Sequence, residues 1–315
     1  MKKLIIAAAV AAVTASSVNA ATIYEGNGLT YKLKGDWQVQ LRDNASKSKD
    51  TEVEFDDLEL KNSITYDLGN GLKAFGQLDF GFKNAAEDKS GVDGSQLEEA
   101  YVGLDFGGAA VAVGKQNYAT DEFGVEGAYE HYEAEDAFDA VSTSGDDVIR
   151  LDVSNDNFTV IASTELEAEG EGSANGSSFD LFAATNLGGV ELAVAYQNYE
   201  ATPSSADQDS WGVSAATKLG SVALAADYST TDTGSVDLDI YNVVAKFKAS
   251  KTTTFALGLT EQELSSSTDV TQIYANVTYK FPTQKNVSLF AEISDIDEDG
   301  KDLDMDVLAG MRIKF

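Results

Sequence analysis

The residues of this chain that could do chemistry are mainly carboxylates, and a dense set of them occupies residues 117–147. That stretch contains ten acids and neither Lys nor Arg: Asp121, Glu122, Glu126, Glu130, Glu133, Glu135, Asp136, Asp139, Asp146 and Asp147. Carboxylates in a narrow, partly desolvated passage attract cations and reject anions, because their field is poorly screened there. On a solvated surface loop the same carboxylates would not select ions, and the sequence alone leaves both interpretations open.

Two other patterns suggest catalysis or metal binding. His131 is the only His in the chain and there is no Cys, so no set of partners for a nucleophilic triad is evident and we expect no enzyme. Asp295, Asp297, Asp299 and Asp306 reproduce the spacing of a calcium loop, although the last position is Asp instead of Glu and the flanks alternate like strands. A turn between the last two strands explains these acids equally well, so any Ca²⁺ or Mg²⁺ is expected to bind weakly, and no other cofactor is predicted.

The overall charge excludes one class of partner. The 315 residues include 53 acids and 22 bases, for a formal net charge of -31. Nucleic-acid binding requires a basic surface that displaces counterions. We therefore expect no nucleic acid among the partners.

The first twenty residues predict a signal peptide. Lys2 and Lys3 precede an apolar run from Leu4 to Val13, and Val18-Asn19-Ala20 is a small-residue cleavage site. The chain is therefore expected to be exported, with residues 1–20 as the signal peptide and residues 21–315 as one domain.

From Tyr31 onward the dominant pattern is an alternation of apolar and polar residues, which is typical of β-strands with two different faces. Short turns alternate with longer acidic or Ser-rich loops along the chain, as in a transmembrane β-barrel. A soluble β-sandwich has the same period, but sixteen strands packed in that way would leave sheet edges that closure removes. The sixteen candidate strands are 31–43, 52–66, 71–84, 95–106, 109–116, 146–154, 157–166, 177–187, 190–200, 209–219, 221–231, 236–249, 251–263, 270–281, 286–296 and 303–315. We predict an all-β fold, a 16-stranded antiparallel transmembrane β-barrel.

Several short motifs resemble the general porins of Gram-negative outer membranes. Ala21-Thr-Ile-Tyr24 resembles their opening strand, and Tyr101-Val-Gly-Leu104 and Ala112-Val-Gly-Lys115 resemble their fourth and fifth strands. Gly310-Met-Arg-Ile-Lys-Phe315 resembles their last strand, although the family commonly has Tyr at the position of Ile313.

This resemblance implies a homotrimer in the outer membrane, in contact with its lipid and lipopolysaccharide. Each barrel would be a water-filled channel for small hydrophilic solutes, narrowed by an inward-folded third loop at about residues 117–147. The resemblance also makes Phe315 the signal for outer-membrane assembly.

The resemblance also carries the hypothesis of selectivity. Porins of this family place arginines opposite the third loop, whereas two of the corresponding positions here carry Asp57 and Glu98. We therefore predict a strongly cation-selective pore, with Asp57, Glu98, Asp121, Glu122 and Glu126 as the principal residues. Further lining residues are expected at Glu130, Asp36, Asp79, Lys61, Arg42 and Arg150. The alternatives are a sugar-specific porin, and a structural or adhesive barrel that binds divalent ions at the cell surface.

Overall fold

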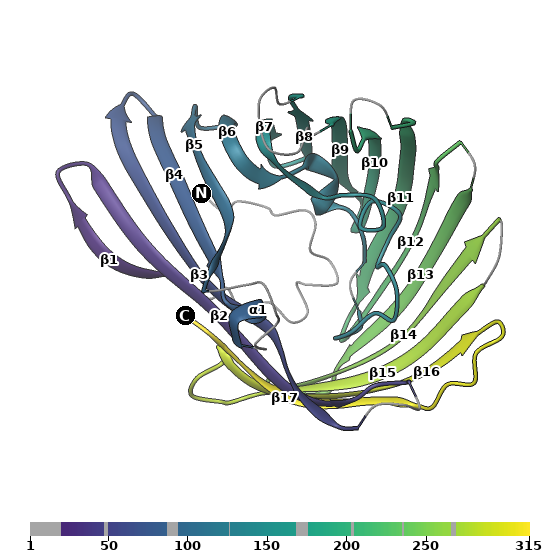
Figure 1. Ribbon diagram of the computed structural model, residues 1–315. Coiled ribbons are helices and arrows are strands. Elements are labelled where there is room, and N and C mark those ends of the chain that lie inside the picture. The colour runs from purple at the N-terminus through teal and green to yellow at the C-terminus, as the bar shows by residue number, and fades with distance from the viewer. Residues whose placement is uncertain are drawn as a thin grey trace.

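The chain folds into a closed ring of antiparallel strands (Figure 1). The computed structural model describes residues 20–46, 50–86, 94–125, 127–167, 176–202, 205–234, 236–265 and 269–315. Each strand from β2 to β17 pairs antiparallel with the next, and β17 pairs with β2 to close the ring. The ring strands are β2 (Leu29–Asp43), β3 (Glu52–Gly69), β4 (Leu72–Gly81), β5 (Gln96–Asp105), β6 (Ala109–Asn117), β7 (Ser144–Ser154), β8 (Phe158–Glu165), β9 (Ser177–Leu187), β10 (Val190–Glu200), β11 (Gln208–Leu219), β12 (Val222–Asp232), β13 (Asp237–Lys248), β14 (Thr253–Leu264), β15 (Val270–Lys280), β16 (Val287–Glu298) and β17 (Asp306–Lys314). The predicted 16-stranded antiparallel barrel is confirmed.

An additional strand precedes the ring and corrects the predicted start of the first strand. β1 (Ala21–Gly26) forms a hairpin with β2, in which Gly26 lies opposite Leu29. Asn27 and Gly28 both have positive φ, 53° and 78°, as a two-residue hairpin turn requires, and Asn-Gly is the preferred sequence for it. β2 therefore begins at Leu29, two residues before the start that apolar alternation predicted.

The two faces of the ring differ in chemistry, as the sequence alternation predicted. Trp211 and Val213 of β11 are exposed, whereas Ser210 of the same strand is fully buried. The same phase places exposed apolar side chains on the outside of β13, β15 and β17. The buried side chains on the inside include polar ones such as Asn242, Gln272 and Asp306 and apolar ones such as Ile240 and Leu308. Aromatic residues such as Tyr66, Phe106, Tyr196, Phe247 and Tyr279 are exposed, as in the aromatic girdles of barrels embedded in lipid.

Connections at the two rims differ in length. Gly69 to Gly71, Gly188-Gly189 and Gly220-Ser221 close tight turns at one rim, which we call the short-turn rim. The opposite rim carries the longer connections, including α1 (Lys83–Ala86) and the 118–143 segment between β6 and β7, which contains η2 (Ala119–Glu122). Among the described residues, no helix has the length and apolarity needed to cross a bilayer.

Candidate functional site

The segment 118–143, here called the β6–β7 loop, packs against the barrel wall through aromatic side chains. Phe123 and Phe138 are buried against Ile161 of β8 and Phe182 of β9, and the Phe123 and Phe138 ring centroids lie 5.2 Å apart. Figure 1 shows this teal segment beside the green strands, inside the outline of the ring. The Phe123 ring occupies the space that a Cβ at Gly212 would need, at 2.5 Å, so the contact depends on glycine at that position of β11.

Wall side chains bind the backbone of the loop at successive strands. Asn242 Nδ2 donates to the Glu135 carbonyl at 2.8 Å, and Gln272 Nε2 donates to the Glu130 carbonyl at 2.9 Å. Further bonds of this kind come from Gln197 to the Ser142 carbonyl, Gln262 to the Ala134 carbonyl and Asn276 to the Gly127 carbonyl. Because a buried carbonyl without a partner is costly, these amides fix the path of the loop along β10–β15.

Arg150 of β7 anchors the first turn of the loop. Its Nη2 lies 2.7 Å from Glu122 Oε1, and its Nη1 donates to the carbonyls of Asn117 and Tyr118 at 3.2 and 3.1 Å. Asp152 on the same strand completes the ion pairing of Arg150 at 3.1 Å. The structure thus brings together two predicted residues, Arg150 and Glu122, as an ion pair.

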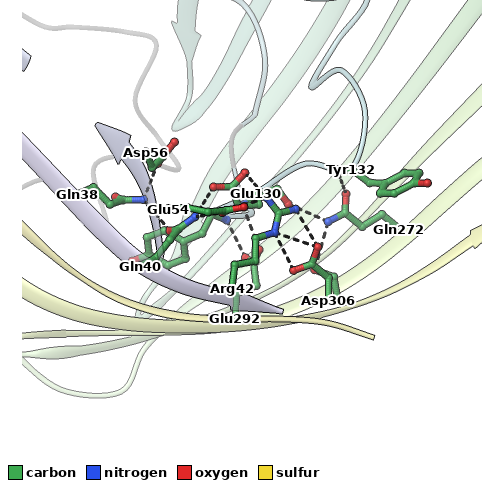
Figure 2. A network of polar contacts seen from close by, with 12 residues as sticks. Gln38, Gln40, Arg42, Glu54, Asp56, Glu130, Tyr132, Gln272, Glu292 and Asp306 are labelled. Atoms are coloured by element: carbon green, nitrogen blue, oxygen red, sulfur yellow. Dashed lines mark hydrogen bonds and ion pairs between the residues drawn. The ribbon is translucent and has the colours of Figure 1, made fainter. Parts of the chain in front are cut away.

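Arg42 of β2 anchors the loop near its middle (Figure 2). Arg42 Nη1 lies 2.9 Å from Glu130 Oε2, and Arg42 Nη2 lies 2.8 Å from Asp306 Oδ2. Gln40 Nε2 donates to the same carboxylate of Glu130 at 2.5 Å, and the amide N–H of Glu130 donates to Glu292 at 3.2 Å. Burial raises the pKa of Glu130, and the charge of Arg42 opposes that shift. Arg42 and Glu130 were both predicted, and they too form an ion pair.

Two further titratable groups of the loop are buried against the wall. Burial, together with the charges of Asp227 and Asp139, raises the pKa of Asp136 to about 7, although backbone N–H groups of Phe138 and Asp139 donate to its carboxylate. Burial lowers the pKa of His131 to about 4, against the charge of Asp139. Within the described residues neither ring nitrogen of His131 has a hydrogen-bond partner, and its Nε2 lies 4.0 Å from Glu135 Oε1.

On the facing wall, Asp57 lies at an irregularity of β3. The β2–β3 register shifts between Trp37 and Val39, which adds a residue to the β3 side of the ladder at Asp56 and Asp57. Such bulges re-aim side chains. Asp57 pairs with Arg312 Nη2 of β17.

Asp36, another predicted residue, lies in the same group of charges. It pairs with both bases at the end of β17, at 2.7 Å from Arg312 Nη2 and 2.6 Å from Lys314 Nζ. Asp36 and Asp57 are therefore partly neutralised by Arg312 and Lys314, which were not among the predicted residues.

Glu98 also lies at a bulge, opposite the register shift between Asp79 and Phe80. It lines a cavity of about 630 Å³ between β3–β5, the end of β6 and the first residue of β7. Lys61 Nζ lies in this cavity, 2.8 Å from Asp79 Oδ2 and 3.1 Å from Glu99 Oε2. The cavity is lined by four carboxylates, of Glu59, Asp79, Glu98 and Glu99, and by two ammonium groups, of Lys61 and Lys115, a formal charge of 2 - 4 = -2.

The remaining predicted residues are more scattered. Asp121 is exposed and accepts a hydrogen bond from Asn117 Nδ2 at 2.7 Å, whereas Glu126 lies outside the described residues. The four residues of the calcium pattern are not brought together: Asp295 and Asp297 are exposed, while Asp306 is buried in its pair with Arg42. Among the described residues no group of three acids or His is arranged to hold a metal. The predicted signal peptide, residues 1–20, lies outside the described residues except for Ala20.

The uncharged side chains that bind the β6–β7 loop were not predicted from the sequence. Five neutral side chains lie in the inward phase of their strands and bind the loop, and none of them was among the predicted residues: Gln197, Asn242, Gln262, Gln272 and Asn276. A usable signal was present, because buried strand positions that carry Gln or Asn need partners. In the structure those partners are backbone carbonyls of the β6–β7 loop.

A closed ring with an apolar outer face, a polar inner face and a long loop bound to that inner face defines a transmembrane β-barrel of the porin type. The family model for Gram-negative porins matches residues 7–301, and the chain belongs to that family. Family and fold together imply the outer membrane, and they point to a channel instead of an enzyme.

Individual relatives agree with this assignment. The porin-like protein H of Photobacterium profundum is 28% identical over 160 residues, which is 50% of this chain and 45% of that protein. The chain therefore matches about half the length of that curated relative. Two solved structures share the fold. The trimer form of OmpT, an outer membrane protein of Vibrio cholerae, has a TM-score of 0.74 at 16% identity, covering 92% of this chain and all of that one. An anion-selective porin from Comamonas acidovorans has a TM-score of 0.73 at 15% identity, covering 91% and 100%.

Proposed function

We propose that this porin is a diffusion channel for small hydrophilic solutes that prefers cations strongly over anions. The observation that carries the proposal is the cavity beside the loop ends, where four carboxylates face two ammonium groups. These six groups carry a formal charge of -2, and Lys61 lies between two of the carboxylates, those of Asp79 and Glu99. The fold by itself does not decide whether cations or anions are preferred, because a barrel of the same fold is described as anion-selective.

The β6–β7 loop is the constriction in this proposal. Arg150 and Arg42 hold it at Glu122 and Glu130, and the wall amides hold it between these anchors. A loop fixed in this way narrows the passage towards β3–β5, so permeating ions pass close to Glu98 and Asp79. Fixed carboxylates at such a narrow point select cations.

Reversal potentials in a KCl gradient across a planar bilayer test this function. We expect conducting channels with a reversal potential close to that of potassium. Equal permeability of potassium and chloride would contradict cation selectivity. A barrel without any conductance would favour the structural or adhesive alternative, and blockade of the current by an oligosaccharide would favour a sugar-specific porin.

We also propose the assembly and export that the resemblance implies. A homotrimer is supported by the trimeric form of a barrel with the same fold, and light scattering of the detergent-solubilised protein would test it. Cleavage after Ala20 would be tested by the mass of the mature chain. Contacts with lipid and lipopolysaccharide, the role of Phe315 in assembly, and weak binding of Ca²⁺ or Mg²⁺ to surface acids remain expectations of the same kind.

A further inference from the structure

The charges on one half of the barrel wall are separated along the pore axis. In β11–β17 the ends near the short-turn rim comprise residues 216–226, 245–257, 277–291 and 311–315, which contain eight bases and no Asp or Glu. These bases, here called the basic arc, are Lys218, Lys246, Lys248, Lys251, Lys280, Lys285, Arg312 and Lys314. The other ends of the same strands and their loops, residues 207–215, 227–244, 258–276 and 292–310, contain seventeen acids and one base, Lys301.

Most of the basic arc faces the lumen. From β10 to β17 the ladders run without a register shift, so each strand keeps its phase from end to end. Lys246 and Lys248 share the phase of Asn242, and Lys280 shares the phase of Gln272, both of which bind the β6–β7 loop. Strand alternation therefore directs these lysines to the same inner face.

The bases of the arc are close enough to act together. Lys280 and Arg312 both lie opposite Ser288, in one row across β15, β16 and β17. Lys280 interacts electrostatically with four other bases: Lys248, Lys285, Arg312 and Lys314. Asp36 and Asp57 pair with Arg312 and Lys314, and the other six bases of the arc lie on β11, β13, β15 and the turns that follow β13 and β15.

We infer that the pore is bipolar along its axis, with an acidic half towards the long loops and a basic arc at the short-turn mouth, and that it therefore conducts ions asymmetrically. The inference rests on the proposed channel function and adds that current flows more easily in one direction than in the other. When the long-loop side is positive, cations enter through the half that attracts them and anions enter past the basic arc, so both accumulate in the lumen. With the opposite polarity each ion must enter through the mouth that repels it, and the lumen is depleted of carriers.

The experiment records current at equal positive and negative voltages through single channels of the full chain, in symmetric KCl. Because the chain has no Cys, an Ala206→Cys variant reports orientation through a charged, membrane-impermeant thiol reagent added to one side. At 0.1 M KCl we expect the current with the long-loop side positive to exceed the reverse current by a factor of about 1.5 or more, falling towards equality at 1 M as the screening length drops from about 10 to 3 Å.

The variant that tests the basic arc combines Lys248→Gln, Lys251→Gln, Lys280→Gln and Lys285→Gln. It should conduct with a clearly smaller asymmetry and prefer cations more strongly than the parent, whereas replacement of the same four lysines by Arg should preserve the asymmetry. Equal currents in the parent at 0.1 M, the opposite sense of asymmetry, or an unchanged asymmetry in the Gln variant would overturn the inference. A symmetric but cation-selective parent would leave the proposed function intact, while chloride selectivity or lack of conductance would contradict both.

Discussion

The wall that binds the loop and the wall that faces it use polar side chains differently. Along β10–β15, Gln197, Asn242 and Gln272 present neutral amides to backbone carbonyls of the loop. Along β3–β5, Glu59 and Glu98 present carboxylates to an open cavity. A neutral amide can satisfy a buried carbonyl without adding charge to the lumen. One wall therefore positions the loop, and the other carries the carboxylates to which we assign the proposed selection of ions.

Loss of Arg42 should have the largest effect, because Arg42 pairs with carboxylates of both the loop and β17. Arg42→Gln leaves the buried carboxylates of Glu130 and Asp306 without their cation. Removal of one partner of a buried ion pair costs about 3 kcal/mol or more. We expect the loop to detach, seen as rapid cleavage by a glutamate-specific protease.

Arg42→Lys, which keeps the charge, is the matched control and should lose less protection. If Arg42→Gln resisted the protease as well as the parent does, the anchor assigned to Arg42 would be wrong.

A methyl group at Gly212 should disturb the apolar part of the same contact. The added Cβ would lie 2.5 Å from the Phe123 ring, and overpacking of this kind costs about 1–3 kcal/mol. We expect Gly212→Ala to increase protease cleavage of the loop and to leave the barrel folded. Gly108→Ala is a suitable control, since the nearest atom to its Cβ is the Ser154 carbonyl oxygen at 3.9 Å.

The pH dependence of loop binding should separate two buried groups. The pKa of Asp136 rises from 3.8 to about 7 in the bound loop, so its contribution weakens binding as pH increases through that interval. The pKa of His131 falls from 6.5 to about 4, so its contribution weakens binding as pH decreases through that interval.

The two contributions oppose each other in the parent protein, and single variants reveal each one. Asp136→Asn should make protection from the protease increase between pH 5 and pH 8, and His131→Gln should make it decrease. If protection from the protease changed with pH in the same direction in both variants, the roles assigned to Asp136 and His131 would be wrong.

The sequence predicted the ring well, because the alternation in strands such as β11 and β15 is a local property that sheet closure preserves. The alternation missed β1, whose six residues are too short for a clear period, although the resemblance marked Ala21–Tyr24 as an opening strand and Asn27-Gly28 marks the turn. Four residues were predicted to line the pore, but their ion pairs were not predicted: Arg42 with Glu130, and Arg150 with Glu122. Such pairs join residues far apart in the chain, and only the path of the loop decides which carboxylates remain available to ions.

The most direct measurement is the permeability ratio of potassium to chloride for the parent and for the Glu59→Gln, Glu98→Gln double variant. Both carboxylates line the cavity beside the loop ends, and Asp295→Asn with Asp297→Asn on the exposed face is the matched control of equal charge change. We predict a ratio well above unity in the parent and the control, and a decrease of roughly two- to fivefold in the double variant. An equal ratio in all three proteins would contradict the claim that the wall of β3–β5 selects the ions.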